Sequence, residues 1–236
     1  MLENHLEALK TMKLHIYIFR HGESYFNKKD KKRFTGWTDS KLTPKGIKQA
    51  KVLAKRLKNK KFQIAYQTRL SRSKDTLKYV LKYHPECKKI ITDNRMIERS
   101  YGKLQGQTHE GFIERIGKKA YNVLKEGDII DDFDKKTREK VEKLIGEAEY
   151  KIIHRSYHVP PPGGESIKMV EKRVNSFIKD LLKEMKKEKV SVAISSHNNS
   201  MRPFRKYFEK LNVKQMMKLE NPWDDYFHYT VEVKEK

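Results

Sequence analysis

Short apolar segments alternate along this chain with segments that have the periodicity of amphipathic helices. The first apolar segment, Leu14 to Phe19 (LHIYIF), is rich in β-branched and aromatic residues and is typical of a strand buried in a sheet. Further candidate strands are Phe62 to Tyr66, Lys89 to Thr92 and Val190 to Ser195. Candidate helices begin at Pro44, with Thr43 as N-cap, and run through Ser73 to Tyr83 and Ser166 to Met185. The alternation predicts an α/β fold, a three-layer αβα sandwich with a mostly parallel central sheet.

The region between Gly106 and Pro160 interrupts this alternation. It is charged, has weak helical periodicity and contains no strong strand signal. It ends in PPPGG, a stiff turn followed by flexible glycines. We therefore predict one domain at 14–236, with a helical insertion at about 107–160 that lies over the active site.

The first 13 residues (MLENHLEALKTMK) have a different pattern. Apolar side chains recur there at helical spacing, which predicts a short helical extension at residues 1–13. The segment lacks the continuous apolar stretch of a secretory signal, and no run in the chain approaches the roughly 20 apolar residues that span a bilayer. The single cysteine, Cys87, excludes an intrachain disulfide. These features predict a cytoplasmic protein.

Basic residues dominate the charge, with 54 Lys and Arg against 31 Asp and Glu and a formal net charge of +23. Such a surface attracts phosphates, nucleic acids and anionic membranes. The lysines are spread in ones and twos over almost every segment, however, and aromatic residues are not interleaved with them as nucleic-acid stacking platforms require. The pattern favours solvated helix faces and a small anionic substrate, with no nucleic-acid or membrane partner.

An arginine and a histidine, Arg20 and His21, directly follow the first candidate strand. A guanidinium group matches the geometry of phosphate oxygens, and an imidazole can hold a phosphoryl group as a nucleophile. An RHG triplet alone is more simply interpreted as a surface histidine at the end of a strand. The segment SSHNNS from Ser195, at the end of a second strand, makes a phosphate site at the carboxyl ends of the strands the better interpretation.

Six segments carry a resemblance to a known family. They are RHGESYFN from Arg20, RFTGWTDSKLTPKG from Arg33, QTRLSRSKDT from Gln67, ERSYGKLQG from Glu98, RSYHVPPPGGES from Arg155 and SSHNNSMR from Ser195. With these segments in this order, the chain resembles the histidine phosphatase superfamily and, within it, the cofactor-dependent phosphoglycerate mutases. The resemblance covers most of the chain.

The resemblance implies a catalytic set around His21, which would become phosphohistidine. Arg20, Arg72 and His197 would surround the phosphoryl group, and Glu98 would act as acid and base. Taken alone, Arg72 is more simply a helix-surface residue, His197 a core histidine and Glu98 a solvent-facing carboxylate. The predicted substrate-binding residues are Asn27, Thr35, Gly36, Tyr101, His109, His154, Arg155 and Asn199.

Several positions depart from the mutases that the chain resembles. His109 replaces a lysine, and His154 followed by Arg155 replaces a pair of arginines that would hold the substrate carboxylate and its second phosphate. Histidine can carry charge, but less fully at pH 7 than lysine or arginine. Asn198 replaces a glycine, and asparagine is the residue that best tolerates the left-handed backbone glycine often adopts. His154 and His158 lie four apart without the context of a metal motif, so no metal site is predicted.

Three functions compete at this point. The first is interconversion of 3-phosphoglycerate and 2-phosphoglycerate, a step of glycolysis and gluconeogenesis, through a phosphohistidine primed by 2,3-bisphosphoglycerate as cofactor. The second is a phosphatase of small phosphorylated metabolites that uses the same nucleophile, which the changes at His109 and His154 keep open. The third is a noncatalytic basic protein that binds nucleic acid, against which the retained nucleophile and acid argue. The sequence leaves open whether the chain forms a homo-oligomer.

Overall fold

A five-stranded sheet forms the centre of the computed structural model, which describes residues 11–28 and 32–234. The strands are β1 (Thr11–Arg20), β2 (Ile64–Gln67), β3 (Lys89–Thr92), β4 (Val192–Ser196) and β5 (Tyr226–Lys234). Their order in the sheet is β3-β2-β4-β1-β5. Four strands are parallel, and β5 runs antiparallel to β1 at one edge. The predicted mostly parallel sheet is confirmed.

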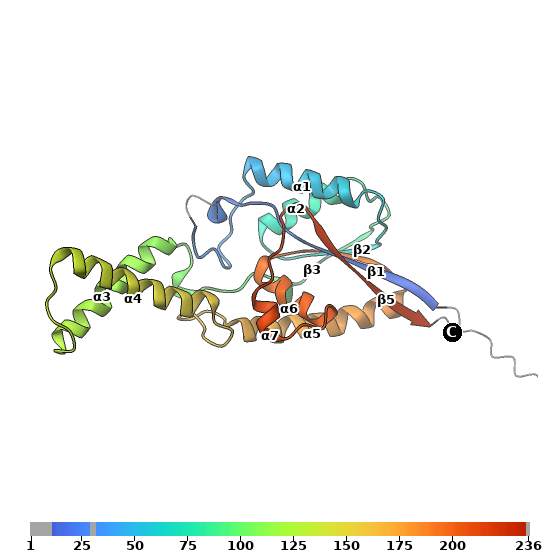
Figure 1. The fold of residues 1–236 in the computed structure, drawn as a ribbon. Helices are drawn as coiled ribbons and strands as arrows, with labels where there is room; N and C mark the ends of the chain where they lie inside the picture. Colours follow the sequence, from blue (N-terminus) through green and yellow to red (C-terminus); the bar gives the residue numbers. More distant parts are fainter. Residues whose placement is uncertain (1–10, 29–31, 235–236) are drawn as a thin grey trace, which may run out of the picture.

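Helices cover both faces of the sheet (Figure 1). They are α1 (Pro44–Leu57), α2 (Ser71–Leu81), α5 (Ile167–Glu188), α6 (Asn198–Phe208) and α7 (Val213–Met217). Short 3-10 turns occur at Tyr25–Asn27 (η1), Asn94–Met96 (η2) and Gly102–Leu104 (η3). Helices α1 and α2 pack on one face, and α5 and α6 pack on the other. The predicted three-layer sandwich is therefore confirmed.

The alternation of side chains along β1 explains why both faces are covered. Ile16 and Ile18 contribute to the core under α5 and α6, whereas Tyr17 and Phe19 contribute to the core under α1 and α2. Successive residues of a strand point to opposite faces, so a strand buried on both sides reads as a continuous apolar run. This is the pattern of LHIYIF.

One correction concerns the N-terminal extension. Thr11, Met12 and Lys13 are part of β1 and pair with the end of β5, so the helix predicted for residues 1–13 is wrong at its last three positions. The physical reason is β5, which was not predicted and which offers β1 a partner along its whole length. The rest of the predicted extension, residues 1–10, lies outside the described residues.

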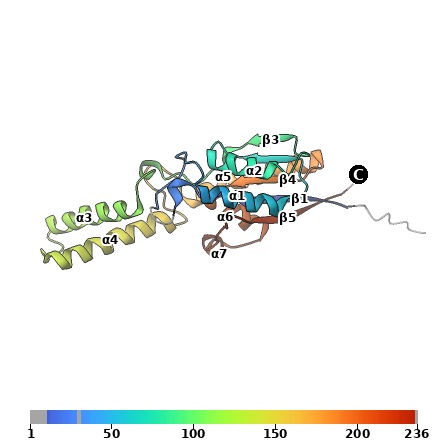
Figure 2. The same ribbon diagram turned by 90° about the horizontal axis from the view of Figure 1, so that it is seen from above.

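The predicted insertion consists of two antiparallel helices, α3 (His109–Glu126) and α4 (Lys135–Arg155), called the hairpin below. Both views show it projecting away from the end of the sheet (Figures 1 and 2). Only residues at its base reach the cavity described next. The prediction that the insertion lies over the active site is therefore correct for the base of the hairpin and wrong for its far half.

Candidate active site

A cavity of about 460 Å³ lies where β1 ends. The predicted site residues that line it are Arg20, His21, Asn27, Thr35, Gly36, Arg72, Glu98, Tyr101, His109, His154, Arg155 and Asn199. His197 is not among the lining residues, but its ring centre lies 4.9 Å from that of His21. The register of β1 and β4 pairs Arg20 with Ser196, and the backbone amide of His21 donates to the Ser196 carbonyl at 3.1 Å. The two strand ends therefore bring the two histidines together.

His21 is held in one tautomer. The side chain is buried, and its Nδ1 lies 2.7 Å from the carbonyl oxygen of Gly22. Because a carbonyl only accepts hydrogen bonds, Nδ1 carries the hydrogen and Nε2 keeps its lone pair. Burial, together with the charges of Arg72 and Arg20, lowers the pKa of His21 well below 6.5. At pH 7 this imidazole is neutral and can act as a nucleophile through Nε2.

Two buried guanidinium groups accompany His21. Arg72 donates to the carbonyls of Gly36 at 2.8 Å and Thr38 at 2.9 Å. Arg20 donates to the carbonyl of Asn221 at 3.3 Å, and its guanidinium lies over the indole ring of Trp223. Burial lowers the pKa of each arginine to about 10, with the Glu98 carboxylate opposing the shift. Both remain cationic at pH 7.

His197 is fully buried and belongs to the same cluster. Its Nε2 lies 2.9 Å from the hydroxyl of Thr68, a partner that the sequence analysis did not identify. Its Nδ1 has no hydrogen-bond partner among the described residues. Burial, with a contribution from Arg72, lowers the pKa of His197 well below 6.5.

Glu98 presents a carboxylate to the cavity from a fixed position. Its Oε1 accepts from the backbone amides of Arg99 at 2.8 Å and Asn199 at 3.2 Å. Its backbone carbonyl accepts from Nε1 of Trp37 at 2.7 Å and from Arg173 at 3.0 Å. Hydrogen bonds therefore fix both the carboxylate and the backbone carbonyl of Glu98.

Asn198, beside His197, does not have a left-handed backbone. It is the first residue of α6, and it is not among the described residues other than glycine that have a positive φ. Its side-chain oxygen accepts from the amide of Asn221 at 3.0 Å. Asparagine would tolerate a left-handed backbone, but Asn198 does not adopt one because the helix begins here.

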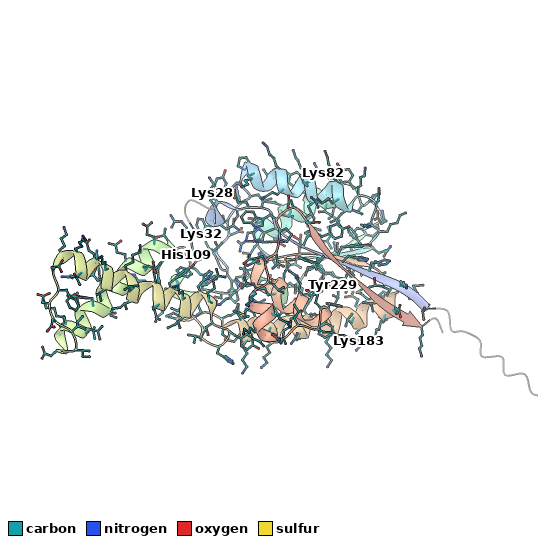
Figure 3. The ribbon with its side chains drawn as sticks, in the orientation of Figure 1. Lys28, Lys32, Lys82, His109, Lys183 and Tyr229 are labelled. Carbon is teal, nitrogen blue, oxygen red and sulfur yellow. The ribbon has the colours of Figure 1, made fainter. Side chains whose placement is uncertain are left out.

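The opposite end of the cavity, formed by the base of the hairpin, is aromatic. The hydroxyl of Tyr150 lies 3.1 Å from Nδ1 of His109, and the Tyr150 ring stacks on His154 at 5.0 Å between centres. Burial lowers the pKa of His109 to about 4 and that of His154 to about 3, and nearby cations add to both shifts. The expectation that these histidines carry partial charge at pH 7 is therefore corrected: both are neutral. Figure 3 shows His109 and Lys32 where the hairpin meets the body.

Sequence reasoning missed several residues that line the cavity. They are Lys32, Arg33, Tyr150, Asn198, Arg202, Glu220, Asn221, Pro222 and Trp223. Arg33 and Arg202 stand inside two of the six family segments and could have been found there. Tyr150 and Trp223 had no local signal, because the turn of a helix and the course of a loop decide whether such aromatic side chains reach a cavity.

Two histidines and two arginines lie together where β1 and β4 end, an arrangement that suits phosphate chemistry. Residues 16–129 and 122–231 match the family described as histidine phosphatase superfamily (branch 1). The chain belongs to that superfamily and is an enzyme of it.

Individual relatives and structures agree with this assignment. A 2,3-bisphosphoglycerate-dependent phosphoglycerate mutase of Methanococcus vannielii is 30% identical, with 88% of this chain and 86% of the relative covered. A mutase of the same name from Parvibaculum lavamentivorans is 34% identical, with 86% and 84% covered. The solved structure of the alpha-ribazole phosphatase from Shigella flexneri has a TM-score of 0.66 at 19% identity, with 91% and 89% covered. The last likeness shows the shared fold.

Among the described residues, no helix is both long and apolar enough to cross a membrane. Within the same residues, no three His, Cys, Asp or Glu side chains are grouped as metal ligands would be.

Proposed function

We propose that this chain is a 2,3-bisphosphoglycerate-dependent phosphoglycerate mutase that interconverts 3-phosphoglycerate and 2-phosphoglycerate through a phosphohistidine at His21. The observation that carries the proposal is a single cavity that joins the neutral, lone-pair-bearing Nε2 of His21 to a fixed carboxylate, Glu98, and to cations on several sides. The lining cations are Arg20, Lys32, Arg33, Arg72, Arg155 and Arg202. This number of cations suits a substrate with two anionic groups. The mutase names of relatives that are 30% and 34% identical also support it.

Unpartnered polar atoms around the cavity fit a phosphorylated cofactor. Nε of Arg20, Nε of Arg72 and Nε1 of Trp223 are buried without hydrogen-bond partners in the described part of the chain. A buried donor left unpaired costs about 1–3 kcal/mol, which phosphate or carboxylate oxygens would relieve. Bound 2,3-bisphosphoglycerate would supply the priming phosphoryl group, held by Arg20 and Arg72 near His21.

Each residue of the proposed catalytic set has a separate role in the reaction. Phosphorylated His21 transfers its phosphoryl group to the 2-hydroxyl of 3-phosphoglycerate, so the P–N bond breaks as the P–O bond forms. Glu98 accepts the proton of that hydroxyl. Nε2 of His21 next accepts the phosphoryl group from the 3-position, and Glu98 returns the proton to the oxygen released. Arg20, Arg72 and His197 stabilise the charge on the phosphoryl oxygens in both steps.

A phosphatase of small phosphorylated metabolites is the second candidate. The observation that favours it is the neutral pair His109 and His154, which lies where the resembled mutases hold a second anionic group with lysine and arginine. A cavity that holds the second anion weakly would release it, and water would then accept the phosphoryl group from His21. The alpha-ribazole phosphatase with the same fold is named for such a hydrolysis.

The deciding experiment supplies 3-phosphoglycerate with and without 2,3-bisphosphoglycerate, and follows 2-phosphoglycerate and free phosphate together. The mutase proposal expects rapid isomer exchange that depends on the bisphosphate, with little free phosphate. Release of phosphate without isomerisation contradicts it and establishes the phosphatase. His21→Ala serves as the blank for both activities.

A further inference from the structure

The hairpin has one apolar face that the described structure leaves largely uncovered. Its residues are Ile116, Ala120 and Val123 on α3, and Val141, Ile145, Ala148 and Ile152 on α4; among them, Ile116 packs partly against the core cluster at the base of the hairpin. Two of them are well exposed: Val123 at 57% and Ile152 at 47%. Large side chains exposed together on one surface mark an interaction site in a soluble protein.

Two glycines show that Ile116 and Ile145 lie on the same side of the helix pair. A Cβ at Gly117 would overlap the carbonyl of Glu142, and a Cβ at Gly146 would overlap that of Ile113, so both glycines lie between the two helices. Ile116 and Ile145 each precede one of these glycines and are rotated from it by about 100° in the same sense. Because the helices are antiparallel, equal rotations bring both side chains to the same side of the pair.

The other side of the hairpin is different. Lys118 and Lys125 of α3 and Lys143 of α4 project there, and all three are exposed. Such a charged face is solvated, as expected for a helix pair in water. The contrast between the two sides shows that the apolar face is specific to one surface of the hairpin.

Charge is distributed unevenly between the hairpin and the body. From His109 to Arg155 the chain has 11 Lys and Arg and 11 Asp and Glu, so the whole excess of +23 lies outside the hairpin. Within the hairpin, residues 126–134 at its free end contain five acidic residues and no lysine or arginine. The free end is thus acidic, whereas the body from which the hairpin projects is strongly basic.

We propose that a second copy of this chain covers the apolar face, with the two hairpins antiparallel in a four-helix bundle. In that arrangement the acidic free end of each hairpin lies against the basic body of the other copy, and opposite charges attract. A parallel arrangement would instead place acidic ends together. An anionic membrane is a poorer occupant, because the hairpin has no net charge to draw it to anionic lipid.

The size of the face suits a dimer. Helix α3 has 18 residues, and at 1.5 Å per residue it is about 27 Å long. Two helices side by side are about 20 Å wide, so the pair would cover roughly 500 Å² on each copy and about 1,000 Å² in total, the lower range of specific interfaces. The proposal does not depend on which phosphoryl acceptor the active site uses.

The test measures the molar mass of the full chain by sedimentation equilibrium between about 1 and 100 μM, a range in which interfaces of this size form. We expect twice the monomer mass of 28.1 kDa. Val123→Glu should shift the dissociation constant at least tenfold toward the monomer. Asn122→Glu, the matched control, adds the same charge to the charged side and should leave it unchanged. Circular dichroism of both variants verifies that the hairpin is still folded.

A second variant tests the antiparallel arrangement. Asp131→Lys reverses one charge at the free end and should weaken the dimer severalfold, and added salt should weaken the wild-type dimer in the same way. A monomer at 100 μM, a dimer insensitive to Val123→Glu, or one strengthened by Asp131→Lys overturns the proposal. So does a monomer that sediments with phosphatidylglycerol vesicles through the same face.

Discussion

The two ends of the cavity are built from different kinds of contact. At the phosphoryl end, His21, Arg72 and Glu98 are fixed by hydrogen bonds to backbone groups at or near the edge of the sheet. At the hairpin end, His109 and His154 are held mainly by aromatic neighbours. Backbone hydrogen bonds fix both the direction and the position of a side chain. A stacked aromatic ring, in contrast, can be replaced by a side chain of another shape.

The difference extends to charge. Both buried arginines at the phosphoryl end remain cationic at pH 7, with the Glu98 carboxylate offsetting part of the cost of burial. The two histidines at the hairpin end are neutral and lie near further cations. We infer that the phosphoryl end determines whether phosphoryl transfer occurs, and that the hairpin end determines which molecule receives the group. Four experiments test this division.

The largest effect is expected at the phosphoryl end. His21→Ala removes the only nucleophile that the proposed mechanism uses and should reduce kcat by about 10⁴-fold or more. The acid-labile phosphoenzyme should disappear with it. His228→Ala, a histidine on β5 outside the cavity, is the control and should keep both. A labelled phosphoenzyme in His21→Ala would exclude the proposed nucleophile.

The second-largest effect is expected for Glu98→Gln. The amide keeps an acceptor for the backbone amides of Arg99 and Asn199 but cannot exchange protons, so kcat should fall by about 10²- to 10³-fold with little change in KM. Glu188→Gln, at the exposed end of α5, is the matched control. A large increase in KM at unchanged kcat would instead indicate a binding role.

The third experiment measures stability against pH at the hairpin end. His154 has a pKa of about 3 in the folded chain and about 6.5 when unfolded, so the unfolded chain gains the proton first as pH falls. Its neutral form therefore stabilises the fold fully above pH 6.5, and this contribution is lost as the pH falls toward 3. Between pH 7 and 5 the free energy of unfolding should fall by about 2 kcal/mol from this group.

The variant His154→Gln should remove that part of the pH dependence in urea unfolding. His158→Gln, at an exposed position four residues on, should leave it in place. An unchanged slope in His154→Gln would mean that the histidine is not held neutral by burial.

The smallest effect is expected for His109→Lys. A permanent cation at the hairpin end should lower the KM for 2,3-bisphosphoglycerate about threefold to tenfold, because a hydrogen bond to a charged group contributes about 1 kcal/mol more than a neutral one. The kcat should change less than threefold. His158→Lys provides the same charge outside the cavity. A kcat loss comparable to that of Glu98→Gln would contradict the division between the two ends.

The sequence by itself predicted β1 to β4 and the helices α1, α2 and α5, together with most of the proposed catalytic set, but not β5, α6 or α7. The β3 range was predicted without error, Thr43 caps α1 as expected, and Ser166 caps α5. These features depend on periodicity and capping, which act over a few residues and can be read locally. Arg20, His21 and His197 could be placed at one sheet edge because parallel strands end together.

Only the tertiary structure decided the partners and charge states. Thr68 lies 129 positions from its partner His197, and no local pattern connects them. The first residues of β1 are a strand because β5, from the other end of the chain, pairs with them. The neutrality of His109 and His154 follows from burial that the fold alone creates. Contacts between distant segments set solvent exposure and electrostatic environment, and neither quantity is a property of a local sequence.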